Sequence, residues 1–210
     1  MQFVISMLNL EVVSMSDNTQ GIPKEWKVTE LGDSAHFELI MGQSPPSSSY
    51  NEGGKGIPFM QGNAEFGVIY PKPSKCTTEP TKIAQKNDIL ISVRAPVGEL
   101  NMADSRLCLG RGLGAIRVKE GDCWFYFYYF QTIKTKIQNM SKGSTFKAID
   151  KDQVERITVP LPPLSEQQKI AEILTTVDDA IELERKRKAK LERVKKGLMD
   201  ELLTGRTRVN

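Results

Sequence analysis

The stretch that decides the fold is residues 157–174, Ile-Thr-Val-Pro-Leu-Pro-Pro-Leu-Ser-Glu-Gln-Gln-Lys-Ile-Ala-Glu-Ile-Leu. It starts with a short apolar run that is typical of a strand. Three prolines then hold the backbone extended, because proline fixes φ and lacks an N–H donor, so neither a sheet interior nor a helix continues through them. Ser165 stands where an N-cap belongs, and Gln168 completes a capping box three residues later. The stretch therefore predicts a strand that gives way to a helix.

The predicted helix is unusually long. No proline or glycine interrupts it before Gly197, and Gly205 provides a C-terminal stop. Residues 166–203 would form a rod of about 57 Å, at about 1.5 Å per residue. We expect a single helix of that length on a small protein to span a distance or to pair with another helix.

Apolar side chains form a seam along this rod, interrupted near its middle by charged residues. A long helix is stable in water chiefly when such a stripe is buried, and the globular part of the chain can cover only one end. We therefore expect an antiparallel coiled coil between two copies, in which Glu184 of one chain meets Arg187 or Lys188 of the other. The residues expected at this dimer interface are Ile173, Val177, Ile181, Glu184, Arg187, Lys188, Leu191, Val194, Leu198 and Leu202.

Basic residues are concentrated in the middle of the rod. Residues 185–196 carry eight basic side chains and one acidic side chain, although the net charge of the whole chain is only +3. This band is either a footprint for DNA phosphates or an acidic partner, or it is simply a solvated helix face. The solvated face is supported by pairs at i,i+4 spacing, which are Glu182–Lys186, Glu184–Lys188 and Glu192–Lys196.

Length and composition fit one or two domains of an ordinary soluble protein. The 210 residues are 39% hydrophobic and 26% charged, and no run of about 18 apolar residues could span a membrane. Residues 1–20 lack the basic start of a signal peptide, so we expect a flexible leader.

Three widely spaced cysteines form no Cys-x-x-Cys pair, which argues against zinc and disulfides and fits a reducing cytoplasm. We expect the single histidine, His36, to be structural or exposed.

The first 160 residues are predicted to form a mixed domain, which gives the whole chain an α+β fold. Strands are predicted at residues 89–93, 114–118 and 157–159, and loops at 42–56 and 71–80. A helix is predicted at 122–141 from apolar residues at helical spacing. Its aromatic run, residues 124–130, is assigned to the core because that spacing is typical of packing, although aromatic side chains can also stack on bases.

The 160–174 segment resembles the start of the conserved helical region in specificity subunits of type I restriction-modification systems. Other segments resemble the target-recognition domain of the same family, and they occur in the expected order. They are Ile-Pro-Lys-Glu-Trp at 22–26 with Leu-Gly at 31–32, Gly-Gln-Ser-Pro-Pro at 42–46, Ile-Pro-Phe-Met-Gln-Gly at 57–62, Asp-Ile-Leu-Ile-Ser at 88–92, and residues 142–149. The resemblance covers residues 21–205.

This resemblance implies a target-recognition domain at 21–160 and a helical dimerisation and spacer region at 161–210. It implies double-stranded DNA as a partner, together with methyltransferase (M) and restriction/translocase (R) subunits that carry the S-adenosylmethionine and ATP chemistry. Family members usually have two recognition domains and two helical regions, whereas this sequence has one of each. It is either a natural half-subunit or a fragment; as a homodimer it would read a two-part palindromic target.

No catalytic motif is recognisable in the sequence. Residues 53–56, Gly-Gly-Lys-Gly, lack the spacing and the hydroxyl of a phosphate-binding loop, and there is no methyltransferase, nucleotide-cofactor or serine-hydrolase signature. We therefore expect a protein that binds rather than an enzyme, without a cofactor or a metal of its own.

Polar and basic residues on loops bounded by glycine or proline are the best candidates for DNA contacts, because loops can enter a groove while the scaffold stays rigid. Arginine can read guanine, glutamine or asparagine can read adenine, and serine, threonine and lysine suit phosphates. The candidates are Gln43, Ser44, Tyr50, Gln61, Asn63, Arg94, Arg111, Lys142, Ser144, Thr145 and Lys147. Each could instead be an ordinary surface residue, and Arg111 could stabilise a turn.

Two other functions are considered. The first is a coiled-coil adaptor whose globular domain binds another protein instead of DNA. The second is an enzyme, for which the sequence offers no motif. Binding to specific DNA in the presence of a methyltransferase subunit would separate the first alternative from a specificity subunit.

Overall fold

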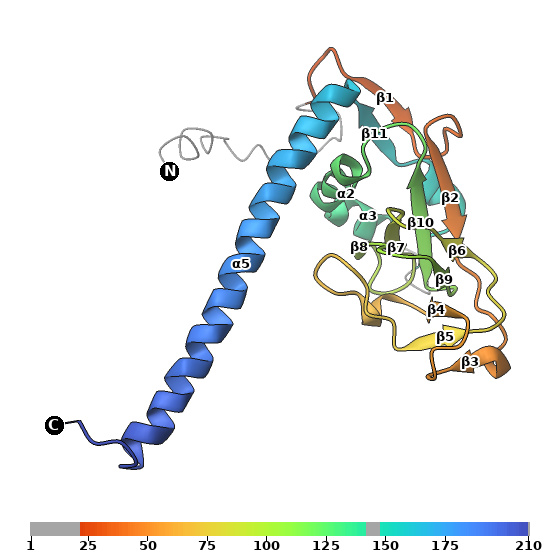
Figure 1. The fold of residues 1–210 in the computed structure, drawn as a ribbon. Coiled ribbons are helices and arrows are strands. Elements are labelled where there is room, and N and C mark those ends of the chain that lie inside the picture. Colours follow the sequence, from red (N-terminus) through yellow and green to blue (C-terminus); the bar gives the residue numbers. More distant parts are fainter. Residues whose placement is uncertain (1–21, 142–147, 210) are drawn as a thin grey trace.

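A computed structural model describes residues 22–141 and 148–209 (Figure 1). A β-rich body is joined at one end to helix α5, which runs away from it as a rod (Figure 1). The helices are η1 (Ser47–Ser49), η2 (Asn63–Glu65), α2 (Cys123–Thr132), α3 (Lys134–Met140), α4 (Lys151–Glu155) and α5 (Leu164–Leu203). No helix in the described part of the chain is both long and apolar enough to cross a membrane.

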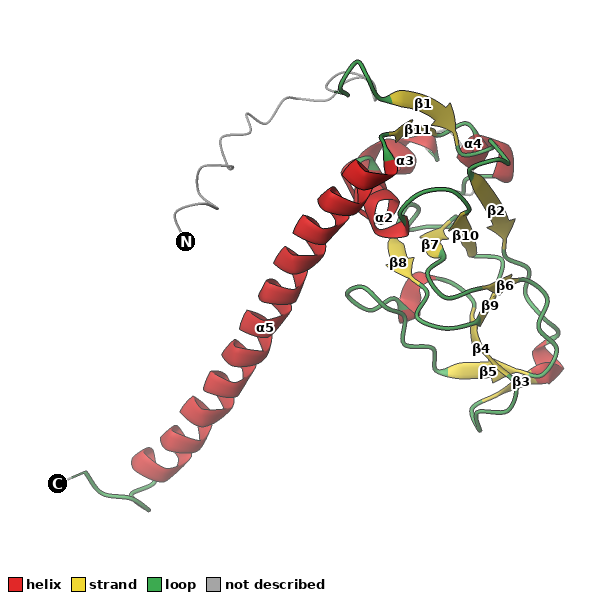
Figure 2. Ribbon diagram, turned by 45° about the horizontal axis from the view of Figure 1, so that its top comes forward, coloured by secondary structure: helices red, strands yellow, loops and turns green. Residues whose placement is uncertain are grey.

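The body contains three sheets (Figure 2). A two-stranded sheet pairs β1 with β11, a four-stranded antiparallel sheet has the order β2-β10-β7-β8, and a five-stranded mixed sheet has the order β3-β5-β4-β9-β6. The strands are β1 (Lys27–Glu30), β2 (Phe37–Met41), β3 (Tyr50–Asn51), β4 (Ile57–Met60), β5 (Lys75–Thr77), β6 (Ile83–Ala84), β7 (Ile89–Ser92), β8 (Leu100–Met102), β9 (Leu107–Leu109), β10 (Leu113–Val118) and β11 (Thr158–Leu161).

The three strands expected from the sequence are confirmed as β7, β10 and β11, each shifted by one or two residues. The expected loops at 42–56 and 71–80 were wrong in part, because they contain η1, β3 and β5. β11 continues through Pro160, which faces Val28 of β1. A two-stranded sheet has only edge strands, so it tolerates a residue without an N–H donor.

The main core lies between the four-stranded sheet and α2. Phe37 of β2 packs edge-on against Tyr126 of α2, with ring centroids 4.9 Å apart, and both are almost fully buried. The assignment of most of the 124–130 aromatic run to the core is confirmed, since its fully buried members are Phe125, Tyr126, Phe127 and Phe130. The single helix expected at 122–141 was wrong: Ile133, with ψ of 9°, separates α2 from α3.

The start of α5 differs from the sequence expectation. Pro163 is the N-cap, and its carbonyl accepts hydrogen bonds from the N–H groups of Glu166 and Gln167. Ser165 lies inside the helix, so the predicted capping box at Ser165 was wrong. A capping box does occur at α4, where the Asp150 side chain accepts from the Gln153 N–H and the Gln153 side chain accepts from the Asp150 N–H.

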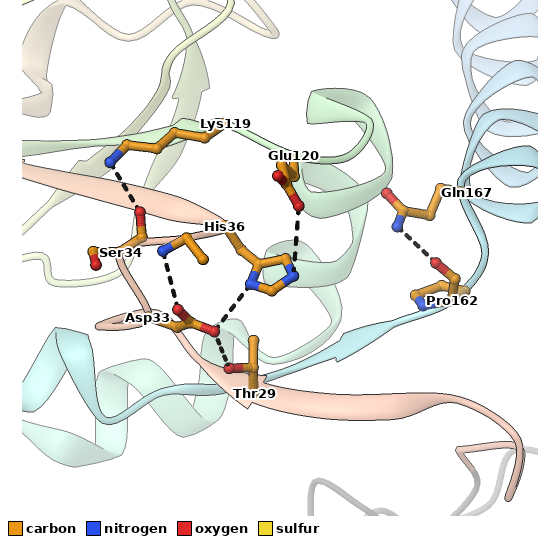
Figure 3. A network of polar contacts seen from close by, with 9 residues as sticks. Thr29, Asp33, Ser34, His36, Lys119, Glu120, Pro162 and Gln167 are labelled. Atoms are coloured by element: carbon orange, nitrogen blue, oxygen red, sulfur yellow. Dashed lines mark hydrogen bonds and ion pairs between the residues drawn. The ribbon is translucent and has the colours of Figure 1, made fainter.

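Gln167 fixes the angle at which α5 leaves the body. Its side chain is buried, its Nε2 donates to the Pro162 carbonyl at 2.8 Å (Figure 3), and its Oε1 accepts from the Asp122 N–H at 2.9 Å. Asp122 is itself the N-cap of α2, so one amide links the starts of α2 and α5. Farther along α5, Ala171 is buried, and the Tyr128 hydroxyl of α2 donates to Asp178 at 2.7 Å.

Beyond these contacts α5 is exposed to its end. The expected stop is confirmed, because Gly205 has a φ of +72° directly after the C-cap residue. Of the three expected i,i+4 ion pairs, only Glu182–Lys186 is present, at 3.7 Å. The other two were wrong, because Glu184 pairs with Arg187 at 3.6 Å and Glu192 pairs with Lys188 at 3.9 Å.

His36 has the structural role expected for it. Its Nδ1 lies 2.9 Å from Oδ2 of Asp33, in a network that joins the β1–β2 turn to the end of β10 (Figure 3). The pKa of Asp33 is lowered first by the N–H of Ala35, then by the Thr29 hydroxyl and by His36. Because the pKa of Asp33 is lower in the folded chain than in the unfolded chain, its carboxylate stabilises the fold at pH values above the unfolded-state pKa. This contribution is lost as the pH falls through the lowered pKa of the folded state.

Replacing Gln167 tests whether one amide anchors the rod. We expect Gln167→Ala to lower the free energy of unfolding by about 2 kcal/mol, because the buried Pro162 carbonyl and the Asp122 N–H lose a partner. Gln168→Ala is the matched control: this neighbour is exposed, and the change should stay within about 0.5 kcal/mol. Urea unfolding followed by circular dichroism measures both, and equal effects of the two variants would contradict the role of Gln167.

Candidate nucleic-acid interface

The loop that follows β2, the loop that follows β4 and the turn between β9 and β10 meet in one place. The Gly42 N–H donates to the Leu113 carbonyl at 2.9 Å, and the Gly110 N–H donates to the Met60 carbonyl at 2.7 Å. The Gly112 N–H donates to the Gln61 carbonyl at 3.1 Å. The first bond lies in the four-stranded sheet, the second lies in the five-stranded sheet, and the third joins the ends of strands from both sheets. The loops are therefore held by both sheets. We call residues 42–44, 61–62 and 110–112 the loop cluster.

Glycines allow the backbones of the loop cluster to approach closely. A Cβ atom at Gly42 would lie 2.2 Å from the Gly110 carbonyl oxygen, and one at Gly110 would lie 2.7 Å from the Cα of Gln61. A Cβ at Gly112 would lie 2.6 Å from the Gln61 carbonyl oxygen. No side chain fits at these distances, so the loops can pack together only with glycine at these positions.

Two candidates, Ser44 and Gln61, are brought into direct contact. The Ser44 Oγ lies 3.0 Å from Oε1 and 2.9 Å from Nε2 of Gln61, and it also accepts the Arg111 N–H at 3.3 Å. Because the Ser44 Oγ lies at nearly the same distance from Oε1 and Nε2, it faces the edge of the Gln61 amide that carries both atoms. Glutamine uses the same edge for bidentate contacts with adenine. Ser44 therefore holds the Gln61 amide in place by the edge that could read a base.

Arg94 lies on a fourth loop beside this cluster. The N–H of Val93 donates to the Gly112 carbonyl at 3.0 Å, and Arg94 forms an isolated bridge with Ala148. The side chains of Arg94, Arg111, Gln43 and Gln61 are all exposed. The structure thus gathers five sequence candidates from separate loops into one region. The candidates Lys142, Ser144, Thr145 and Lys147 lie outside the described residues, as does the expected 1–20 leader.

Tyr50 and Asn63 are placed differently. The Tyr50 ring stacks on Phe59 at 4.6 Å, and its hydroxyl donates to the Pro45 carbonyl at 2.9 Å, so its polar atom already holds the 45–50 loop. Asn63 begins η2 and lines a hollow with Pro96 and Glu99. Both residues are close to the loop cluster in the chain but are partly buried.

Thr81 and Lys82 are neighbours of the loop cluster that sequence reasoning missed. The Thr81 hydroxyl donates to the Gln43 carbonyl, and the Lys82 carbonyl accepts the Leu109 N–H at 2.8 Å. The Lys82 side chain is exposed. These residues carry no local sequence signal, because they come next to Gln43 only through the pairing of β6 with β9.

The structure thus has a β-rich domain that displays arginine, glutamine and serine side chains from glycine loops. A long C-terminal helix follows this domain. The sequence comparisons fit this arrangement. Residues 23–193 match the family described as type I restriction modification DNA specificity domain. The match covers most of the chain, which therefore belongs to this family.

Individual relatives support the same assignment. The chain is 53% identical over 190 residues to a putative type I restriction enzyme MjaX specificity subunit of Methanocaldococcus jannaschii, covering 90% of this chain and 45% of the relative. It is similar to the crystal structure of the HsdS subunit from Thermoanaerobacter tengcongensis, with a TM-score of 0.68, 36% identity, and coverage of 86% and 45% of the two chains.

A further structural relative comes from work on complex assembly and conformational transition of the type I R-M system. It has a TM-score of 0.71 and 37% identity, and the match covers 86% of this chain and 46% of that chain. The chain thus spans about half the length of the relatives it matches.

Replacing Gly110 tests the close packing of the loop cluster. We expect Gly110→Ala to lower the free energy of unfolding by about 1–3 kcal/mol, because the new Cβ must push the Gln61 backbone away. Gly62→Ala is the matched control, since no atom lies within 4 Å of its Cβ position and the change should stay within about 0.5 kcal/mol. Thermal unfolding compares the two; a neutral Gly110→Ala would show that the loops are not packed as described.

Proposed function

We propose that this chain is the sequence-reading, non-catalytic part of a type I restriction-modification complex, and that it reads one half of a two-part DNA target. The observation that carries the proposal is the convergence of Gln43, Ser44, Gln61, Arg94 and Arg111 on one exposed region of a DNA specificity domain. In this proposal residues 21–160 form the target-recognition domain, and residues 161–210 form the dimerisation and spacer region.

Base reading would use the loop cluster as a preformed surface. Arg94 and Arg111 have the planar donors that match guanine, and the Gln61 amide has the donor and acceptor that match adenine. Ser44 occupies the Gln61 edge in the absence of DNA, so an adenine would take the place of the Ser44 hydroxyl. Lys82 is exposed beside Gln43 and suits a phosphate contact that adds affinity without base preference.

The second half of the target would be read by a second copy. Seven apolar residues of the expected interface are between 42% and 60% exposed in the single chain, so their burial needs a partner. In an antiparallel pair with its axis between Arg187 and Lys188, three pairs of apolar seam residues lie level with each other, while Leu191 lies level with the partner's Glu184. Ile173 then lies level with the partner's Leu202, Val177 with the partner's Leu198, and Ile181 with the partner's Val194.

Charge favours the same antiparallel arrangement. Residues 164–184 carry six acidic side chains and one basic side chain, whereas residues 185–196 carry eight basic and one acidic. With this axis, residues 191–196, which carry three basic side chains, lie beside residues 179–184 of the partner, which carry three acidic ones, whereas residues 185–190 of the two copies face each other. A parallel pair would set like charges together along the whole of both parts. The basic band would then contact the partner helix. Methyltransferase and restriction subunits are proposed to dock on this assembly in the cytoplasm and to supply its catalysis.

DNA binding by variants of the loop cluster tests the proposed reading surface. We expect Gln61→Ala and Arg94→Ala each to weaken binding to the specific target by about 1–3 kcal/mol and to relax the preference at one base pair of each half-site. Lys82→Ala should weaken binding to all sequences and lower its salt dependence. Gel-shift titrations with the methyltransferase subunit present measure these effects on specific and random DNA.

The matched control for these variants is Lys27→Ala, which should bind like the unmodified chain. Lys27 is an exposed basic residue on β1, which belongs to the separate two-stranded sheet. If the unmodified chain shows no preference for any DNA with the methyltransferase subunit present, the proposal fails and a protein-binding adaptor is favoured.

Sedimentation tests the second copy. The unmodified chain should be a dimer, and Leu191→Asp combined with Leu198→Asp should give monomers, since burial of each leucine contributes roughly 1.5–3 kcal/mol. Leu183→Asp is the control, because Leu183 is 65% exposed and lies outside the seam. A stable monomer for the unmodified chain at micromolar concentration would rule out the dimer.

A further inference from the structure

An aromatic groove lies between the body and the first half of α5. Two adjoining hollows of about 520 and 330 Å³ share Ile69, Tyr70, Asp178 and Asp179. The body supplies an apolar floor, and α5 supplies a wall of carboxylates. The floor consists of Val68, Ile69, Tyr70, Trp124 and Tyr128, and the wall consists of Glu172, Asp178, Asp179 and Glu182. We call this feature the α2–α5 groove.

The floor of the groove is held rigidly but is left open. Trp124 meets Tyr70 edge-on with centroids 6.3 Å apart, and Tyr128 lies 6.2 Å from Trp124 on the other side. Tyr70 is 44% exposed and Val68 is 74% exposed. A pair of fixed aromatic rings with exposed apolar surface is suited to a ligand that stacks on them.

The wall of the groove is negatively charged. Within residues 22–141 and 148–209, Glu172, Asp178 and Asp179 form no ion pair, and Asp178 only accepts the Tyr128 hydroxyl. Burial raises the pKa of Tyr70, and the carboxylates of Asp104 and Asp179 raise it further. Among the described residues that line the groove, the basic ones are Lys72 and Arg185.

The groove and the apolar seam are on opposite faces of α5. Successive residues of a helix are about 100° apart, so the groove residues Thr175, Asp178 and Glu182 point about 160° away from the centre of the seam. A second copy that covers the seam would therefore leave the groove open. A second copy on the seam and a ligand in the groove would thus contact different faces of the helix.

We propose that the α2–α5 groove docks a lysine- or arginine-bearing segment of a partner protein. A cation placed over the Tyr70 and Trp124 rings gains a cation–π contact, and the unpaired carboxylates of Glu172 and Asp179 accept its N–H donors. Aliphatic parts of the same side chains cover Val68 and Ile69. DNA does not fit this surface, because phosphates would face carboxylates. The proposal does not depend on the DNA-reading role of the loop cluster.

Titration calorimetry on the full chain tests the groove with a defined probe. The probe is a short synthetic peptide of alternating arginine and glycine with capped ends, and its comparison peptide has glutamate in place of arginine. The arginine peptide should bind and the glutamate peptide should not. Glu172→Gln combined with Asp179→Asn keeps the side-chain shapes but removes two charges, and it should weaken binding about tenfold.

The matched charge control is Glu52→Gln combined with Glu79→Gln, two exposed acids of the body outside the groove, which should leave binding within about twofold. Tyr70→Leu should weaken binding about threefold and Tyr70→Phe should not, because only the aromatic ring is needed.

Three results would overturn the proposal. They are no heat of binding with the arginine peptide, the same loss for the groove and control variants, and a groove variant that dissociates the dimer in sedimentation. The last result would assign the groove to the second copy instead of to a different protein.

Discussion

The structure depends on one constraint: α5 carries an apolar stripe that a single chain does not bury. The body reaches Ile170 and Ala171 and holds the helix through Gln167 and Tyr128, but the stripe from Ile173 onward remains exposed. Helices of this kind are stabilised mainly by burial of that stripe. An antiparallel pair centred between Arg187 and Lys188 would bring three apolar pairs of the stripe together and would place residues 191–196 beside the acidic residues 179–184 of the partner. The proposed second copy would bury the stripe.

The loop cluster, in contrast to the exposed stripe of α5, is held together by close packing within one chain. Glycines at 42, 110 and 112 let three loops touch backbone to backbone, and backbone bonds to two sheets keep them there. The Gln61 amide is bonded to Ser44 when no ligand is present, so reading an adenine would exchange these two hydrogen bonds for two bonds to the base. In the proposed dimer, the length of α5 would set the distance between the two loop clusters.

Features with a local cause could be predicted from the sequence. The rod from 166 to 203 followed from the absence of proline and the position of Gly205, and the polar loops followed from Gly42, Gly62 and Gly110. Features set by distant partners could not. β5 and β6 are too short to show a period, and Thr81 reaches Gln43 only through sheet pairing. Apolar residues keep their helical spacing across Ile133, so the sequence does not show the break between α2 and α3. At the start of α5, the Pro163 carbonyl takes the capping role expected of Ser165.

The most direct measurement is the spacing between half-sites methylated by the assembled complex when α5 is shortened. Deleting residues 186–192 keeps the phase of the seam and removes about 10 Å of helix, at about 1.5 Å per residue. That length corresponds to about three base pairs at about 3.4 Å each. The account predicts the same half-site bases with a gap about three base pairs shorter. A variant that stays folded and dimeric but keeps the original gap would show that the helix does not set the distance.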